Sequence, residues 1–508
     1  MSSTPPPLVA LPTSKERKYD RQLRLWAASG QAALEDAHVL LLNSGSGVTG
    51  IEALKNLVLP GVGSFTILDS AIVTEADLGV NFFLDDDCLG GYRAEHCCRL
   101  LNELNPDVKG HAITEPVESF IAKQDALRPY TLILTLAPVD PSILHTIRSH
   151  AQSYSTPVFY IHCIGFYAHF SLLLPPAFPI VDTHPDSSST TDLRLLTPWP
   201  DLINFAREKT QALETMSDHD HGHVPYVLLL LHYLEGWKAT HDGNAPGTYK
   251  EKSEFRETVR AAARTDDENF DEAVAAVLKS LNPPTPSSAV RDVLSAPECQ
   301  NPARDSPSFW LIANAIVTFL SSHGNQLPLP GAVPDMKSQS NDYIALQNIY
   351  KAKARRDIAE VTASVRSLEK QLGRPTSVPD SEIEAFCKGA AHVKLVRGHP
   401  FHVLEAQKLP KFGDRAGWAV NAMQDPESGL LIYVAFLAWD LFVASHSDGD
   451  LMGAPRMPGL KDVQDDEEKV VGTAEKIVDA VINEAGTFIE EPGYSEVKEG
   501  VAKVVKEL

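Results

Sequence analysis

The sequence predicts an α/β domain with a parallel sheet over the first third of the chain, followed by a larger, mainly α-helical part. Two observations predict the first domain. Short apolar and β-branched runs alternate with segments of helical period, and a glycine-rich turn follows the first of these runs. A third observation predicts the second part, because segments of helical period dominate beyond about residue 177.

The elements of the first domain follow from their apolar runs and breaks. His38–Asn43 is continuously apolar up to its last residue, as expected for a strand buried on both faces of a parallel sheet. A helix through Ile51–Leu59 ends where Pro60 and Gly61 break it. The further strands expected are 64–69, 108–113, 131–136, 158–164 and 166–174, with helices at 93–104 and between 136 and 158.

The helical part and the chain ends complete the predicted organisation. The expected helices are 226–237, 253–264, 271–281, 308–322, 342–372, 382–393 and 430–444, with more helix after residue 462. We therefore expect a flexible leader over 1–14, the α/β domain over 15–176, the helical domain over 177–495 and a terminal helix over 496–508.

Composition excludes several classes of function. The chain has 508 residues with 45 Lys+Arg against 67 Asp+Glu, so a net charge of −22 disfavours binding to nucleic acid. The apolar runs 227–234 and 430–444 are too short to span a bilayer, and the second contains Asp440, so no membrane partner is expected. Six cysteines without a C-x-x-C pair indicate a reducing compartment, with the cytoplasm, the nucleus or both as the expected location.

The strongest local motif is a G-x-G-x-x-G turn formed by Gly45, Gly47 and Gly50 between a strand and a helix. Asp69 ends the next strand, nineteen residues after Gly50. Glycines let the backbone approach a phosphate, a helix N-terminus offers free N–H donors, and the acid accepts from ribose hydroxyls. The motif indicates a nucleotide site, but a tight turn that binds nothing and a nicotinamide-dependent oxidoreductase remain alternatives.

Two other candidate sites are weaker. The run Asp218–His223 contains three histidines and two aspartates, but six adjacent residues seldom converge on one ion, so no metal site is expected. Cys299 lies in a polar loop and would be a nucleophile only if a base lowered the pKa of its thiol.

Two longer segments resemble the ubiquitin-like modifier activating enzymes. Lys18–Trp26 (KYDRQLRLW) is similar to their opening helix, and Glu52–Gly63 (EALKNLVLPGVG) is similar to the segment that leads to their second strand. Both imply a Rossmann-like adenylation domain of the ThiF/MoeB type. The segments 248–256, 306–313, 334–336 and 343–353 resemble the regulatory subunits of the heterodimeric neddylation-activating enzymes, and this similarity extends over about residues 15–465.

Departures from the family pattern imply an inactive adenylation domain. Asp77 and Val80 stand where active members have the asparagine and arginine that hold ATP phosphates, and Arg93 replaces the phosphate-binding lysine. Ala137-Pro138 replaces the magnesium-binding aspartate, and no proline-x-cysteine-threonine motif supplies a catalytic cysteine. Gly45, Gly47, Gly50, Asp69 and Arg93 would then be vestigial, with ATP, Mg²⁺ and the cysteine all in a catalytic partner subunit.

The resemblance also implies what remains for this chain to do. The opening helix would reach across a heterodimer, so that Arg21 approaches the ATP phosphates of the partner, while Arg24 is a weaker, interfacial candidate. The dimer would adenylate the neddylation modifier, and the helical domain, in the place of a catalytic-cysteine domain, would shape the groove that holds it.

Three alternatives stay open beside this interpretation. Arg21 could form an ordinary surface salt bridge, and the chain could be a binding scaffold without a catalytic contribution. It could also be the regulatory subunit for the SUMO-type modifier, although so long a helical insertion is unusual there. Relatives also end with an alanine/glycine-rich helix and final strands, and we expect this return to the sheet to be missing here.

Overall fold

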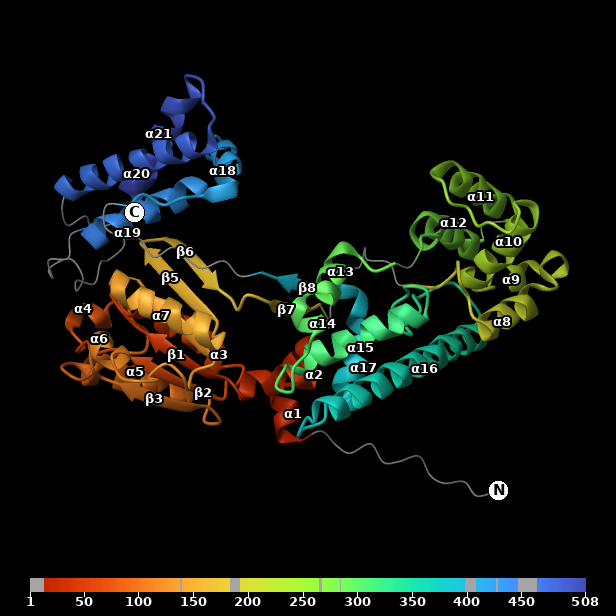
Figure 1. Cartoon of the computed structure of the whole chain (residues 1–508), viewed down its shortest axis with the longest axis horizontal. Helices are drawn as coiled ribbons and strands as arrows, with labels where there is room; N and C mark the ends of the chain where they lie inside the picture. The colour runs from red at the N-terminus through yellow and green to blue at the C-terminus, as the bar shows by residue number, and fades with distance from the viewer. Residues whose placement is uncertain are drawn as a thin grey trace. The chain divides into compact units, whose positions relative to one another are not determined.

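The chain forms two compact units in the computed structural model, which describes residues 13–137, 139–182, 192–264, 267–283, 285–397, 408–425, 428–445 and 464–508 (Figure 1). Unit 1 combines residues 1–178 with 397–508, and unit 2 comprises residues 179–396. The predicted leader, residues 1–14, lies almost entirely outside the described residues.

A six-stranded sheet organises unit 1. Its strands are β1 (His38–Leu42), β2 (Ser64–Leu68), β3 (Lys109–Ile113), β4 (Leu132–Leu136), β5 (Val158–Ile164) and β6 (Tyr167–Leu173), in the order β3-β2-β1-β4-β5-β6. The first five strands are parallel, and β6 returns antiparallel to β5. The chain reverses its direction of strand addition between β1 and β4, where sheets of this type usually bind ligands at the carboxyl ends of their strands.

Helices cover both faces of this sheet. The helices of the first segment are α1 (Ser14–Lys18), α2 (Asp20–Glu35), α3 (Val48–Val58), α4 (Glu75–Leu78), α5 (Arg93–Leu104), α6 (Val117–Ile121) and α7 (Pro141–Tyr154), with a 3-10 turn at Asp86–Cys88. On one face α3 and α5 bury Ile51, Leu54 and Leu101 against the strands. On the other, α7 and α6 bury Ile147 and Phe120. Both faces are thus apolar, which explains the continuous apolar runs of the inner strands.

The C-terminal segment returns to this unit as helices. These are α18 (Ala416–Met423), α19 (Leu430–Ser445), α20 (Gln464–Ala485) and α21 (Gly493–Glu507), after a 3-10 turn at Gly413–Arg415. They share a core of their own, and α19 packs on the sheet through Phe436, whose ring lies 4.9 Å from that of His162 and 5.4 Å from that of His169 (Figure 1, blue helices beside β5 and β6). Asp440 Oδ1 lies 2.9 Å from His162 Nδ1 and accepts a hydrogen bond of 3.4 Å from Tyr160.

This arrangement corrects the predicted domain division. The expected helical domain over 177–495 is divided, because residues 397–495 belong to unit 1. The predicted terminal helix 496–508 is the larger part of α21, and it packs on α19 and α20 through Val497, Val501 and Val505. The chain therefore does return to the sheet, through α19, although the described residues after Arg397 contain no strand.

Unit 2 is mainly helical. Its helices are α8 (Pro200–Thr210), α9 (Asp218–His221), α10 (Tyr226–Thr240), α11 (Tyr249–Ala261), α12 (Glu268–Ser280), α13 (Ser288–Ser295), α14 (Pro297–Gln300), α15 (Ser308–Ser322), α16 (Ser340–Leu372) and α17 (Asp380–Gly389), with 3-10 turns at Leu213–Thr215 and Ala390–His392. A short sheet pairs β7 (Phe178–Val181) with β8 (Val393–Val396), where a helix was expected to continue to Val393. The helices α8, α10, α11 and α12 and the first half of α16 share one hydrophobic core. Phe255, Phe270 and Tyr350 lie within it.

The chain contains both apolar helices, such as α19, and the basic helix α16. Within the described ranges, no helix has the length and apolar character needed to cross a membrane. On α16, Lys351, Arg355 and Arg356 are exposed, and Arg356 pairs with Asp201 at 2.7 Å, whereas the less exposed Lys353 pairs with the buried Asp357.

Candidate functional site

The glycine turn joins β1 to α3 at the carboxyl edge of the sheet. Gly45 and Gly47 have positive φ values of 59° and 70°, a conformation that favours glycine. Gly50 lies in the first turn of α3 against Asn43, and a Cβ there would come within 2.4 Å of Asn43 Oδ1. A Cβ on Gly47 would come within 2.8 Å of Arg93 Cζ. The turn thus has the predicted shape, but the group that approaches Gly47 is a side chain of the same molecule.

Arg93 is buried at this turn, with 4% of its side chain exposed. Its Nε donates to Asp69 Oδ2 at 2.7 Å, and its Nη1 lies 3.1 Å from both Asp77 Oδ1 and the carbonyl oxygen of Ser46. We call Asp69, Asp77 and Arg93 the Arg93 network. Burial by itself lowers the pKa of Arg93, but the two carboxylates outweigh it, so the pKa lies above its ordinary value.

Both carboxylates of the network also accept hydrogen bonds from other groups of the chain. Asp69 Oδ2 also accepts from Asn43 Nδ2 at 2.8 Å, and Asp69 Oδ1 accepts from the amide of Ala71 at 2.9 Å. Asp77 is buried and caps the start of α4, where its Oδ2 accepts from the amide of Thr74 at 2.8 Å. Both oxygens of Asp69, from which the motif predicted bonds to ribose hydroxyls, therefore already accept hydrogen bonds from within the chain.

These residues do not fit a nucleoside triphosphate. The guanidinium of Arg93 fills the space against Gly47, and two buried carboxylates against one cation leave a local charge of −1, which repels phosphate. Val80 is half-buried and carries no charge, Ala137 offers no metal ligand, and Pro138 lies outside the described residues. Asp77 was expected to act only as a repelling carboxylate, whereas it forms part of a built ion-pair network.

The opening helix is attached at the opposite end of α3 from the glycine turn. Tyr19 is buried, and its hydroxyl accepts from Asn105 Nδ2 at 3.1 Å, while the same amide nitrogen donates to the carbonyl of Val58 at 2.9 Å. Lys18 adds bonds to Asn105 Oδ1 at 2.7 Å and to Asp107 at 2.6 Å. The hydrogen bond between Lys18 and Asp107 raises the pKa of the lysine and lowers that of the carboxyl group.

The two family-like segments meet at this attachment. Gly61 has a φ of 89°, and a Cβ there would come within 2.7 Å of the hydroxyl of Tyr19. A Cβ on Gly63 would lie only 1.8 Å from the carbonyl oxygen of Glu35 at the end of α2. Gly61 contacts the start of the opening helix and Gly63 contacts its end. Because a side chain at either position would clash with the helix, the two segments depend on each other.

Arg21 lies on the exposed side of this helix. It makes no ion pair within the part of the chain that the structure describes, so the alternative of an ordinary surface salt bridge is not realised there. Arg24, one turn further, does form such a pair, with Asp20 at 2.9 Å. Leu25 beside them is 55% exposed. The helix therefore presents an uncommitted guanidinium together with apolar surface.

The histidine run Asp218–His223 and Cys299, the two weaker candidates, are in surroundings that do not support a metal site or a nucleophile. His221 is buried and lies 3.1 Å from Asp267, His219 stacks on His223, and the described residues contain no group of three potential metal ligands. Cys299 is also buried, and burial raises the pKa of its thiol to about 12, so the lowered pKa that a nucleophile would require is not found there.

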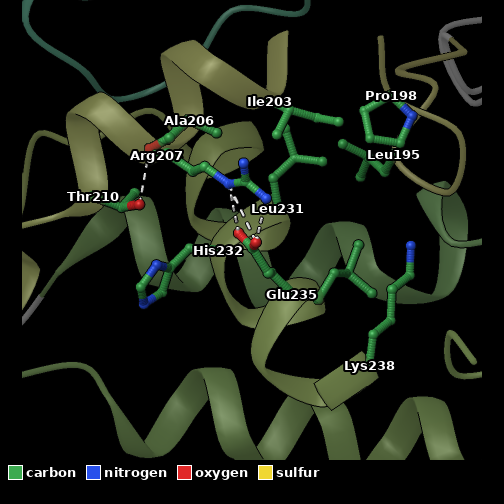
Figure 2. A pocket seen from close by; sticks show the side chains of 11 residues that line it. Leu195, Pro198, Ile203, Ala206, Arg207, Thr210, Leu231, His232, Glu235 and Lys238 are labelled. Carbon is green, nitrogen blue, oxygen red and sulfur yellow. Dashed lines mark hydrogen bonds and ion pairs between the residues drawn. The ribbon is translucent and has the colours of Figure 1, made fainter. Parts of the chain in front are cut away.

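A cleft of about 200 Å³ in unit 2 was not predicted from the sequence. It lies between α8 and α10, with Leu231 and Ile203 among the apolar side chains that line it (Figure 2). At its edge Arg207 pairs with Glu235 at 2.6 Å, and both side chains are more than half exposed. None of the candidate residues named above lines this cleft.

Comparisons with known proteins place the chain in a family. Residues 19–203 match the model of the ThiF family. The NEDD8-activating enzyme E1 regulatory subunit of Xenopus laevis is 36% identical over 440 residues, which cover 84% of this chain and 80% of that protein. The chain belongs to the family of NEDD8-activating enzyme E1 regulatory subunits.

A relative from Arabidopsis thaliana agrees with this membership, and solved structures match part of the chain. The NEDD8-activating enzyme E1 regulatory subunit AXR1 of Arabidopsis thaliana is 35% identical over 435 residues, covering 85% of this chain and 78% of that protein. A crystal structure of E. coli MccB with succinimide covers 31% of this chain and 49% of its own, at 18% identity and a TM-score of 0.27. Neither the SUMO-type regulatory subunit nor the nicotinamide oxidoreductase gains support from these matches.

Sequence reasoning missed the anchoring role of Tyr19 and Asn105 and the closure of the Arg93 network. The available signals were the pairing of the KYDRQ segment with the later glycines, and an arginine and an aspartate that both replace the expected residues. Two replacements of opposite charge, Asp77 and Arg93, indicate that they compensate each other.

Proposed function

We propose that this chain is the regulatory half of a heterodimer that activates the NEDD8 modifier. The relatives carry the name of a regulatory subunit, which supports a catalytic partner. The observation that carries the proposal is a contrast within unit 1. The glycine turn is closed and negatively charged, whereas Arg21, on a firmly attached helix, is exposed and makes no ion pair among the described residues. The chain holds neither ATP nor Mg²⁺ itself, and both are bound in the partner.

Arg21 extends this proposal to the chemistry. We propose that its guanidinium reaches the ATP site of the partner and stabilises the negative charge that builds on the phosphates during adenylation of the modifier's carboxyl terminus. Tyr19, two residues earlier in the chain, supports this role because its buried ring and its bond to Asn105 fix the start of α2. A fixed helix limits the entropy lost when the arginine engages another molecule. The pair works in the cytoplasm, the nucleus or both.

The test is ATP–pyrophosphate exchange that depends on the modifier, measured on the chain copurified with its catalytic subunit. Arg21→Ala is expected to lower the exchange rate at least about tenfold, the size of effect typical for loss of one charge-stabilising donor. Arg24→Ala is the matched control, because it removes an exposed arginine of the same helix that is already paired with Asp20.

The outcomes separate the alternatives. A pair that forms normally with Arg21→Ala and exchanges at the unaltered rate would favour a binding scaffold without a catalytic contribution. A catalytic subunit that is fully active with NEDD8 in the absence of this chain would refute the proposed function itself.

A further inference from the structure

The geometry of the glycine turn points to an internal ligand: Arg93 takes the place of a nucleotide and holds the carboxyl edge of the sheet in one conformation. This inference concerns unit 1 alone and does not depend on the proposed function. It rests on what the guanidinium contacts, on the sign of the charge around it and on the space that it fills.

The guanidinium joins four segments that are separate in the chain. Arg93 belongs to the first turn of α5, and its side chain reaches the Ser46 carbonyl in the glycine turn, Asp69 after β2 and Asp77 in α4. In an ordinary nucleotide site, the ligand links such segments by bonding to the turn and to the acid after the second strand. Here one side chain makes these links without any ligand.

The charge of the pocket is reversed relative to a phosphate site. Asp69 and Asp77 have only 3% and 5% of their side chains exposed, and such buried carboxylates require a cation as partner. The pocket therefore selects a guanidinium rather than an anion. Gly47 serves this selection as well, because a Cβ there would come within 2.8 Å of both Nε and Cζ of Arg93.

The side chain of Asn43 has one buried polar atom that the Arg93 network leaves without a hydrogen bond. Asn43 Oδ1 has no hydrogen-bond partner, although its amide nitrogen donates to Asp69. A buried acceptor without a partner is rare. Asn43 Oδ1 lies against Gly50, where a Cβ would come within 2.4 Å of it, so only glycine leaves room for this oxygen. Asn43 is thus oriented by the Arg93 network at the expense of its own oxygen.

The experiment measures amide hydrogen exchange on the full-length chain. Arg93→Ala is expected to increase exchange about tenfold or more at Gly47, Ala71 and Thr74, because the last two amides donate to carboxylates of the network. Methylguanidinium at millimolar concentration should restore protection at these amides by entering the vacated space, whereas tetramethylammonium at equal ionic strength should not. Arg99→Ala, an exposed arginine of the same helix paired with Glu103, should leave these amides unchanged.

A second variant keeps the test decisive if Arg93→Ala does not fold. Arg93→Lys retains the charge but lacks the planar fork, so it should exchange faster at the same amides while remaining folded. Unchanged protection at Gly47, Ala71 and Thr74 in both variants would overturn the inference. Increased protection of these amides in the unmodified chain on addition of ATP with Mg²⁺ would overturn it too, because the pocket would then accept an anion.

Discussion

The opening helix and the glycine turn each contribute one arginine to unit 1, and the two arginines are in opposite environments. Arg21 is exposed and makes no ion pair among the described residues, whereas Arg93 is buried between two carboxylates. A guanidinium without partners is available to a second molecule, while one whose donors are satisfied inside the chain only stabilises the fold. The position of a charge relative to its partners, and not its presence, thus distinguishes the two roles.

The largest expected effect tests whether the Arg93 network is structural. Arg93→Ala removes the cation that pairs with Asp69 and Asp77, and breaking a buried pair by removing one partner costs about 3–5 kcal/mol. We expect the free energy of unfolding of unit 1 to fall by about this amount in urea denaturation followed by circular dichroism. Arg99→Ala, which removes an exposed arginine of α5, is the control. A loss for Arg93→Ala no larger than that of the control would mean that Arg93 does not stabilise the fold, and the two arginines would then not differ in role.

The pH dependence of stability separates the network from the histidines of the same unit. Burial lowers the pKa of His38, His150 and His169, so these side chains resist protonation in the folded state. As the pH falls through about 6.5, these histidines become protonated in the unfolded chain while they remain neutral in the folded chain. Stability should therefore decrease toward acid pH, by at most about 1.4 kcal/mol per pH unit for each histidine.

The variant that checks this assignment is His169→Gln. Urea midpoints measured between pH 8 and pH 5 should show a smaller acid loss than in the unmodified chain, while the Arg93 network is untouched. An identical slope in both proteins would mean that other groups, and not His169, carry the acid dependence.

A smaller effect sharpens the description of the opening helix. Tyr19→Phe removes the acceptor of the Asn105 bond, but Asn105 still donates to the carbonyl of Val58. We expect a loss of about 1 kcal/mol in the free energy of unfolding. Pyrophosphate exchange by the heterodimer should also fall, but less than with Arg21→Ala, because the arginine remains and only its support is weakened.

The smallest effect concerns an exposed arginine that is paired. Arg207 at the cleft of unit 2 forms an ion pair with Glu235, and both side chains are largely solvated. Exposed pairs contribute little because water competes for both partners. Arg207→Ala should leave the urea midpoint of the chain unchanged within error, and a clear loss would show that exposure alone does not rank the arginines of this protein.

Local sequence predicted the secondary structure of unit 1 closely. The run 158–164 is β5 and the segment 93–104 is α5, as expected, because an apolar run bounded by turn residues determines a strand or a helix without distant contacts. Helices α8, α13 and α18 were missed, since they are only 11, 8 and 8 residues long and short helices depend on tertiary packing for their stability. The strand β8 was not predicted, and the helix expected to end at Val393 overlaps only its first residue.

The Arg93 site shows where such reasoning stops. The sequence identified the glycines, Asp69 and Arg93, and it indicated that the nucleotide site was disabled. It did not show that Asp77 and Arg93, sixteen residues apart, neutralise each other, because a side chain's partner depends on how its segments meet in space.

By itself the sequence determined the class of the fold through its local runs, and its resemblance to the activating enzymes indicated the family and the absence of the residues that hold ATP phosphates. Only the tertiary structure decided that α19 packs on the sheet, that Tyr19 meets Gly61, and that Arg93 is paired inside the chain while Arg21 makes no ion pair among the described residues. Each of these depends on contacts between segments far apart in the chain, which burial and charge pairing select only once the chain is folded.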